Sequence, residues 1–332
     1  MQERNELHYY IDEAEACKHQ LEKRSNQAPS SRQGFLSKLQ SRYRQHQVKK
    51  MLAERKKREK ARLAELIVPF DGLNHEPRKT PLIVSLTSFP ARVNCVAAVV
   101  GGMLRQTLRP DKICVWLGKE KFPDEVIPAE LARLRDAGLV EVNFREDIKP
   151  HTKYFYAMQE YPDAAIVTVD DDIIYRETLL EELWNSYLSM PDCVSCARAH
   201  KIRFDREGAL MPYNDWIMEY RYHVGKPSDR LLATGVGGVL YPPRCFGEEA
   251  FNLPVIKETC LSADDLWLKV MELRYHRKVV LCADSSIPQE ILSTAWGIAL
   301  ANSNLKDEND RQMQAILKHY GMNLIDYMDD EV

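Results

Sequence analysis

The sequence predicts an α/β fold in which a mostly parallel sheet is flanked by helices. From Leu82 onward, short apolar runs alternate with segments of helical composition, as in folds whose strands and helices follow one another around such a sheet. The run "IVTV" at 166–169 is apolar on both faces, which is expected of a strand covered on both sides. With 45% hydrophobic and 29% charged residues, the 332-residue chain has the composition of a globular protein with a substantial core.

The apolar runs and the residues that interrupt them place the individual elements. Strands are expected at 82–90, 112–118, 139–144 and 164–172. Helices are expected at 95–106, 128–138, 152–162 and 302–321. Gly138 and Gly321 stand where a helix commonly ends in a left-handed residue.

Neither the hydropathy nor the cysteines predict an exported or membrane-spanning protein. No apolar run approaches the ~20 residues that a transmembrane helix needs, and the initial "MQERNELHYY" lacks the apolar stretch of a secretory signal. The eight cysteines lie mostly in apolar contexts and are expected to be reduced thiols. We therefore expect a cytoplasmic protein, either soluble or peripheral on the inner face of the cytoplasmic membrane.

Residues 1–75 are predicted to form a helical, basic extension and linker, and residues 76–332 a single domain. Between 35 and 66 there are eleven Lys and Arg residues against three Glu and no Gly or Pro, so a long helix is expected. Two interpretations remain open: a solvated or domain-packed helix, or an arm that binds an anionic membrane surface or an acidic partner protein. Nucleic acid is not an expected partner, because the rest of the chain supplies no base-stacking motif or basic groove.

Three consecutive carboxylates, Asp170, Asp171 and Asp172, end the fourth predicted strand. The carboxyl ends of strands in an open α/β sheet are where ligands bind. If the chain stays extended, Asp170 and Asp172 point to one side and Asp171 to the other. Two converging carboxylates can hold Mg²⁺ or Mn²⁺ and leave positions for phosphate oxygens, although a solvated acidic turn would have the same sequence.

A second acidic pair, Asp264 and Asp265, begins the amphipathic segment "DDLWLKVMEL". Carboxylates at the first turn of a helix are ordinary capping residues. The same pair could also supply a general base near a metal site.

Five motifs between about Leu82 and Val280 resemble nucleotide-sugar-dependent glycosyltransferases of the GT-A fold, related to glycosyltransferase family 2 and similar to bacterial capsule and O-antigen enzymes. The motifs are "SLTSFPAR", "LRQTLRPDKICVWL", the Asp-x-Asp motif in "VTVDDDIIY", "GVGGVLYPP" and "SADDLWLKVM". The resemblance does not extend to the first 75 residues.

The resemblance implies a role for each matching residue. It places Thr87, Ser88, Arg92, Asp147, Lys153, Asp170, Asp171, Gly237 and Gly238 around the donor. Asp147 would lie near the base and Lys153 near the diphosphate. Asp170 and Asp172 would hold Mn²⁺ or Mg²⁺. The glycines around 235–238 would let backbone approach the sugar or the acceptor, or they are only a turn before a strand.

Asp265 is the first choice for the catalytic base, since it matches the second acid of the family's Glu-Asp pair. Asp264 stands where the family usually has glutamate, so the choice between the two neighbours stays open. A carboxylate base that accepts the acceptor's proton implies a single displacement with inversion at the sugar. Nearby, Tyr213 and Trp216 could stack on an acceptor sugar or pack in the core, and His200 is the best histidine candidate for the site.

The predicted function is metal-dependent, inverting transfer of a hexose from a nucleotide sugar, a UDP-sugar by resemblance, to a glycan or glycolipid acceptor in surface polysaccharide synthesis. Two rival hypotheses are kept. A metal-dependent nucleotidyltransferase would also use clustered aspartates, although the sequence has no phosphate-binding G-x-x-x-x-G-K-[ST] loop. An inactive scaffold would act through the basic helix alone.

Overall fold

A computed structural model of the chain describes residues 57–282, 290–292 and 308–329, together with residues 46, 47, 49–51, 53 and 54. The chain divides into two compact units, Met1–Arg62 and Leu63–Val332. In the first unit every described position is helical, as the composition of 35–66 predicts, and the rest of this unit lies outside the described residues. The second unit contains the sheet.

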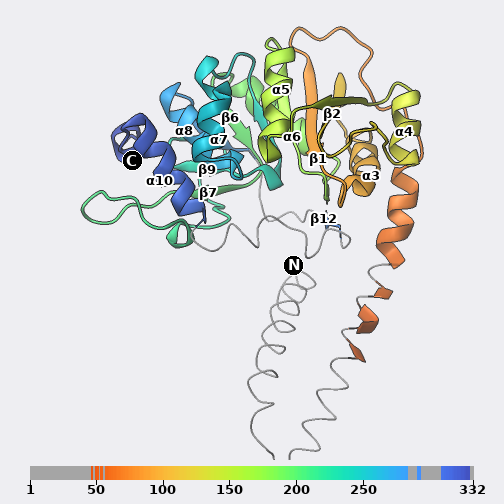
Figure 1. Cartoon of the computed structure of the whole chain (residues 1–332), viewed down its shortest axis with the longest axis horizontal. Coiled ribbons are helices and arrows are strands. Elements are labelled where there is room, and N and C mark those ends of the chain that lie inside the picture. The colour runs from red at the N-terminus through yellow and green to blue at the C-terminus, as the bar shows by residue number, and fades with distance from the viewer. Residues whose placement is uncertain are drawn as a thin grey trace, which may run out of the picture. The chain divides into compact units, whose positions relative to one another are not determined.

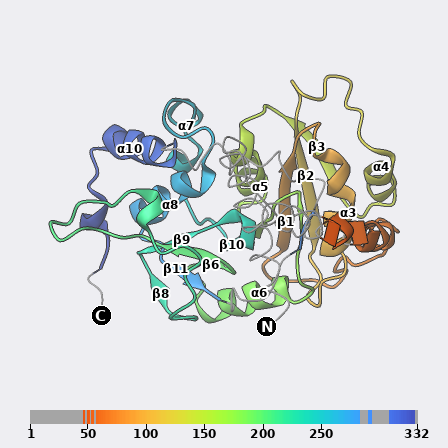
Figure 2. The same cartoon turned by 90° about the horizontal axis from the view of Figure 1, so that it is seen from below.

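An eight-stranded sheet runs through the larger unit in the order β3-β2-β1-β4-β10-β6-β11-β8 (Figures 1 and 2). Its strands are β1 (Leu82–Ser88), β2 (Lys112–Gly118), β3 (Glu141–Arg145), β4 (Ala165–Thr168), β6 (Val194–Cys196), β8 (Pro227–Ser228), β10 (Val239–Tyr241) and β11 (Val279–Leu281). The strands β1 to β4 pair in parallel, as do β6 and β11. Only β10 and β8 run antiparallel to their neighbours, so the predicted mostly parallel sheet is confirmed.

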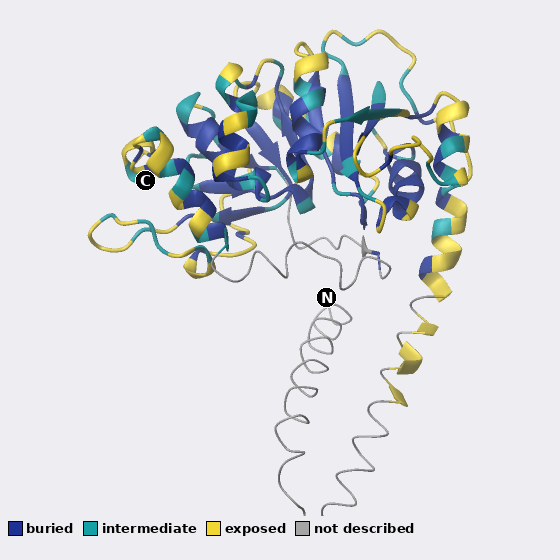
Figure 3. Ribbon diagram, in the orientation of Figure 1, coloured by how far each residue is buried: buried dark blue, intermediate teal, exposed yellow. Residues whose placement is uncertain are grey.

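Helices cover both faces of this sheet. They are α3 (Val93–Met103), α4 (Ala129–Asp136), α5 (Thr152–Glu160), α6 (Leu179–Ser189), α7 (Leu253–Thr259), α8 (Asp264–Arg274) and α10 (Glu308–Tyr320). The alternation of β4 shows the two faces: Val167 packs in the core cluster that contains α3, and Ile166 packs with Ala157 of α5 on the other side. Figure 3 shows this sheet buried between its helices.

The helices α7, α8 and α10 gather at the end of the unit farthest from α4 (Figures 1 and 2). Helix α10 packs against α7 and α8, and Trp267 of α8 is fully buried beneath them. Both predicted helix-ending glycines have a left-handed backbone, with φ of 73° at Gly138 and 59° at Gly321. The predicted helical residues 302–307 lie outside the described residues.

Two short antiparallel pairs complete the fold, β7 (Ala199–Lys201) with β9 (Leu231–Ala233), and β5 (Ile173–Ile174) with β12 (Glu290–Ile291). The segment 202–226, which follows β7, is largely exposed (Figures 1 and 3). It returns to the sheet at Gly225, whose N–H donates to the Leu281 carbonyl of β11 at 2.8 Å. Within the described part of the chain, no helix is both long and apolar enough to cross a bilayer. The seven cysteines in that part are free thiols, as expected.

Candidate active site at the carboxyl edge of the sheet

The ends of β1 and β4 bring a serine, an arginine and the acidic triplet together. These strands are parallel neighbours, so the residues that follow them meet at one edge of the sheet. Ser88 Oγ donates a hydrogen bond of 2.5 Å to Asp171 Oδ2. The Arg92 guanidinium lies 2.8 Å from Asp171 Oδ1 and also contacts the Asp172 carboxylate. One arginine therefore serves two carboxylates.

The acidic triplet is not a solvated turn, because Asp171 and Asp172 are only 6% and 9% exposed. Burial raises the pKa of Asp171 to about 6, although Arg92 acts in the opposite direction. Burial likewise raises the pKa of Asp172. The ionised form of this cluster is thus held at a free-energy cost, as is common at functional sites.

The expected alternation of the three aspartates is wrong. Asp171 and Asp172 both turn to Arg92, whereas Asp170 turns to Lys153. The reason is that β4 ends at Thr168 and the chain then enters a turn, so the two-residue period of extended backbone no longer applies. The phenol oxygen of Tyr175 accepts the Asp170 N–H at 2.8 Å and fixes this turn.

Lys153 on α5 joins the acidic triplet to the second acidic pair. Its Nζ lies 3.0 Å from Asp170 Oδ1 and 3.1 Å from Asp264 Oδ2, and the residue is only 5% exposed. Burial alone would lower the pKa of Lys153, but Asp170, Asp264 and Asp265 outweigh it and raise the pKa well above its usual value. Lys153 is therefore a permanent cation between the two clusters.

Asp265, at the start of α8, accepts a hydrogen bond from a backbone amide of the glycine-rich turn. The Gly235 N–H lies 3.1 Å from Oδ1 and 3.3 Å from Oδ2 of Asp265. Burial raises the pKa of Asp265 and the like charge of Asp264 adds to the shift, while Lys153 opposes it. Asp265 remains partly exposed, whereas Asp264 is buried, so Asp265 is the more accessible carboxylate.

The three glycines of "GVGG" face different surroundings. A Cβ on Gly235 would lie 2.6 Å from Lys153 Nζ and 3.4 Å from Asp265 Oδ1, so this position lies directly against the charged cluster. A Cβ on Gly237 would meet Arg198 Cβ at 2.5 Å, and one on Gly238 would meet Leu179 at 2.9 Å. Gly237 and Gly238 therefore pack against protein, and they form the turn (Gly235–Gly237 and the next residue) that precedes β10.

A buried histidine fixes the chain just before α8. His151 is fully buried, and burial lowers its pKa to about 4, so the ring is neutral. Its Nε2 lies 2.7 Å from the Cys260 carbonyl and donates to it, which leaves Nδ1 to accept from the Tyr154 hydroxyl at 3.1 Å. This contact ties the start of α5 to the segment that carries Asp264 and Asp265.

Tyr213, in the segment after β7, lies on the Asp265 side of the cluster, whereas Trp216 and His200 are buried. Burial raises the pKa of Tyr213, and the charge of Asp265 contributes, so the phenol and this carboxylate are close. Trp216 is 5% exposed and donates from Nε1 to the Met211 carbonyl, which favours the core-packing interpretation. His200 is also buried, and its Nδ1 accepts the Glu219 N–H at 2.9 Å.

The other two predicted donor residues lie at the same edge but outside the cluster. Thr87 is half-buried and donates from Oγ1 to the Trp116 carbonyl at 2.8 Å. Asp147 follows β3 and pairs with Lys121 at 2.5 Å. The sequence analysis did not identify Tyr175, which fixes the Asp170 turn, although its place at the end of "DDDIIY" was a usable signal. It also did not identify Arg198, which binds Thr234 beside the glycine-rich turn, and no sequence signal pointed to that residue.

The carboxylates suit a divalent ion whose other ligands come from elsewhere. The described residues contain no group of three His, Cys, Asp or Glu side chains able to enclose a metal. Asp170 and Asp172 offer carboxylate oxygens, which Mg²⁺ and Mn²⁺ prefer, and the Asp170 side chain is 29% exposed. Arg92 and Lys153 supply two cations against five carboxylates, so a further cation is electrostatically favoured here. The set therefore fits an ion that also takes oxygens from a ligand and from water.

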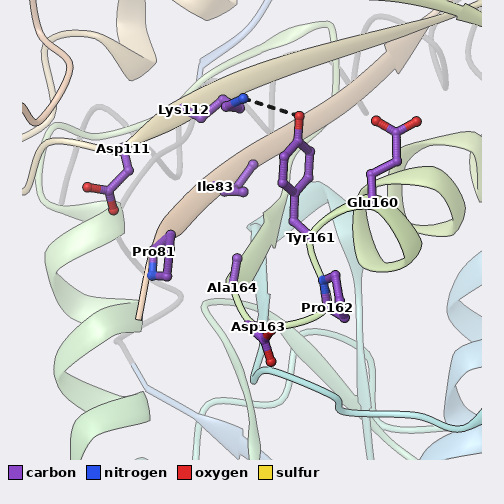
Figure 4. A pocket seen from close by; sticks show the side chains of 9 residues that line it. All are labelled: Pro81, Ile83, Asp111, Lys112, Glu160, Tyr161, Pro162, Asp163 and Ala164. Carbon is purple, nitrogen blue, oxygen red and sulfur yellow. Dashed lines mark hydrogen bonds between the residues drawn. The ribbon is translucent and has the colours of Figure 1, made fainter. Parts of the chain in front are cut away.

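The opposite edge of the sheet has a cavity of a different kind. It has a volume of about 330 Å³ and lies at the amino end of β1 (Figure 4). Lys112 reaches the Tyr161 hydroxyl at 3.2 Å and Glu141 at 2.6 Å, and Asp111 is paired with Arg78. Because its charges are already paired and ligands bind at the carboxyl edge of such sheets, we do not place the active site here.

No protein-family model matches the sequence, and a search of curated proteins gave no significant match. The functional assignment therefore depends on the geometry of the site and on the resemblance of the five motifs.

Proposed function

We propose that this protein is a nucleotide-sugar-dependent glycosyltransferase of the GT-A fold. It would transfer a hexose from a nucleoside diphosphate sugar, a UDP-sugar by the resemblance of its motifs, to a glycan or glycolipid acceptor in bacterial surface polysaccharide synthesis. The parallel β3-β2-β1-β4 half followed by the antiparallel β10 is compatible with that fold.

The observation that carries this proposal is the shared contact of Lys153. Two acidic clusters that are far apart in the sequence both reach its Nζ, at 3.0 Å from Asp170 and 3.1 Å from Asp264. A solvated acidic turn and an ordinary helix cap would have no reason to converge on one buried cation. Glycosyl transfer needs the two clusters together, because one must manage the charge of the diphosphate while the other takes a proton.

In the proposed reaction, Asp265 is the general base. It takes the proton of an acceptor hydroxyl whose oxygen attacks the anomeric carbon, and the bond from that carbon to the diphosphate oxygen breaks with its electron pair on the diphosphate. The Gly235 N–H orients the carboxylate, and Asp264 is held by Lys153. Asp265 is preferred to its neighbour because it is the more exposed, whereas Asp264 is buried.

Asp170 and Asp172 would hold Mn²⁺ or Mg²⁺, and the bound ion would supply Lewis-acid stabilisation of negative charge on the diphosphate. Lys153 and Arg92 keep these carboxylates in place. Asp171 is less suited to hold a metal, because Ser88 contacts one of its carboxylate oxygens and Arg92 the other. Arg92 contacts one oxygen of Asp172.

The proposal can be tested by ligand-induced thermal stabilisation of the full-length protein. A panel of nucleotide sugars is screened with and without Mn²⁺, and bound donor raises the melting temperature by mass action. We expect one donor class to stabilise the wild-type protein only when Mn²⁺ is present, and to have no effect on Asp172→Asn. A melting temperature that no nucleotide sugar changes would contradict the proposal.

A further inference from the structure

The surface beside the Asp265 end of the site has an unusual composition. We define residues 217–226, "IMEYRYHVGK", as the tip segment. Ile217, Met218, Tyr222 and Val224 are 42%, 37%, 70% and 46% exposed. The described residues of the larger unit contain five other large apolar side chains with such exposure, and they are scattered from 68 to 327. This concentration in one short segment is therefore a distinct surface feature.

The charges of the tip segment are predominantly basic. Arg221 and Lys226 are both exposed, and the only acidic residue, Glu219, pairs with Arg198 and Arg221 at 3.2 Å each. Lys226 has no ion pair within the described residues. The tip segment thus presents cations and apolar groups on a chain whose formal net charge is −3.

The tip segment is held by the fold at its base. Ile217 pairs with Lys201 of β7 through hydrogen bonds of 2.9 and 3.0 Å between their backbones, and the Tyr220 N–H donates to Ala199. At its other end the Gly225 N–H donates to the Leu281 carbonyl of β11 at 2.8 Å. Residues 221–226 are all exposed. Figure 3 shows that the segment between β7 and β8 is largely exposed.

A short series of contacts leads from the tip segment to the proposed base. Glu219 pairs with Arg198, and Arg198 donates from its other terminal nitrogen to Thr234 Oγ1 at 2.9 Å. Thr234 precedes Gly235, whose amide binds Asp265. The tip segment therefore borders the side of the site from which an acceptor hydroxyl would reach Asp265.

We infer that the tip segment binds the surface of an anionic lipid bilayer and places the Asp265 side of the site against it. Aliphatic side chains together with an exposed tyrosine suit the boundary between head groups and acyl chains, and Arg and Lys are attracted to anionic head groups. The acceptor would then be lipid-linked, a conclusion that rests on the proposed transfer. The bilayer contact itself does not rest on it.

Sedimentation of the full-length protein with lipid vesicles tests this inference. Vesicles of phosphatidylcholine are compared with vesicles in which about a third of the lipid is phosphatidylglycerol. We expect binding to the anionic vesicles, and at least a tenfold loss of binding in the double variant Tyr222→Ser, Val224→Ser. Val126→Ser is the matched control, because Val126 is 73% exposed but lies alone before α4, and it should bind as wild type.

A second pair of substitutions separates the charge contribution. Arg221→Gln with Lys226→Gln should weaken binding to anionic vesicles by about fivefold for each charge removed and reduce its dependence on salt. The side chains of Arg221, Tyr222, Val224 and Lys226 are all exposed. Both double variants should therefore keep the wild-type circular dichroism and melting temperature. A Tyr222→Trp variant should show a blue shift of its added fluorescence on anionic vesicles.

Three results would overturn the inference. One is wild-type binding by the Tyr222, Val224 double variant, which would assign any membrane contact to residues outside the tip segment. The second is the absence of wild-type binding to anionic vesicles. The third is concentration-dependent dimerisation that the double variant abolishes, since a second copy would then cover this surface. Donor-induced thermal stabilisation, measured without vesicles, is the independent readout of the proposed function and should be unchanged in the double variant.

Discussion

The two edges of the central sheet differ in how far their lysine and carboxylate side chains are buried. At the amino edge, Lys112 of β2 pairs with Glu141, and both are substantially exposed. At the carboxyl edge, Lys153 is buried and three carboxylates raise its pKa. At the amino edge one lysine pairs with one carboxylate, whereas at the carboxyl edge the carboxylates outnumber the cations. An excess that costs stability and lies where sheets bind ligands is a sign of function.

The largest expected effect is a difference in the rate of sugar transfer between a substitution at the carboxyl edge and one at the amino edge. Asp265→Asn removes the proposed base and should lower the rate of sugar transfer by at least the ~10² to 10⁴-fold typical of general-base catalysis. Asp163→Asn is the matched control, because Asp163 lines the amino-edge cavity and forms an exposed pair with Arg244. Initial rates of transfer measure both. Equal rates for the two variants would remove Asp265 from the mechanism.

The next prediction compares how substitution of Lys153 and of Lys112 changes the free energy of unfolding. Lys153→Met leaves Asp170 and Asp264 without their shared cation and should lower the free energy of unfolding by about 3 to 5 kcal/mol, the usual result of removing one partner of a buried pair. Lys112→Met breaks a partly exposed pair and should cost about 1 kcal/mol or less. Urea denaturation measures both. Similar losses in the two variants would mean that the edges do not differ as described.

A third comparison uses two glycines. Gly235→Ala would place its Cβ 2.6 Å from Lys153 Nζ and should cost about 1 to 3 kcal/mol as neighbouring groups are displaced, with loss of transfer. Gly102→Ala in α3 would meet only Ile174 at 3.8 Å and should be neutral or stabilising by up to about 1 kcal/mol. Melting temperatures and transfer rates report the difference. An active, fully stable Gly235→Ala protein would show that the turn has more space than the structure gives it.

The smallest effect is a dependence of stability on pH. The raised pKa of Asp265 means that the folded state binds this proton more tightly than the unfolded state, so ionisation of Asp265 costs stability as pH rises through its folded-state pKa. Asp265→Asn should therefore be more stable than wild type by about 1 kcal/mol at alkaline pH, and the difference should vanish well below pH 4, where Asp265 is protonated in both the folded and the unfolded wild type. Denaturation at several pH values checks the sign. A variant less stable than wild type at alkaline pH would contradict the raised pKa.

Much of the fold could be predicted from the sequence because its signals are local. The parallel strands are continuous apolar runs, and Gly138 and Gly321 end helices in the left-handed backbone that favours glycine. The position of Asp170 to Asp172 followed from strand order alone, since the end of a parallel strand lies at a known edge.

The charge network of the site could not be predicted, because it depends on contacts between distant residues. Arg92 was expected in the nucleotide pocket, and in the folded chain it pairs with Asp171 and Asp172. Which aspartate turns to Lys153 depends on the turn that begins where β4 stops. The exposed side chains of 217–226 also gave no periodic signal, because exposure is decided by what the rest of the chain leaves uncovered.

The central claim is that the carboxyl edge binds a nucleotide sugar and transfers its sugar. Phosphorus NMR of the full-length protein with Mg²⁺, which is diamagnetic and does not broaden the signals, the donor found by thermal stabilisation and a bacterial glycolipid extract as acceptor tests it most directly. We predict that the donor's diphosphate signals are replaced by those of the free nucleoside diphosphate, and that Asp265→Asn leaves them unchanged. Cleavage of the donor between its two phosphates, to a nucleoside monophosphate and a sugar 1-phosphate, or no change with the wild-type protein, would contradict the account.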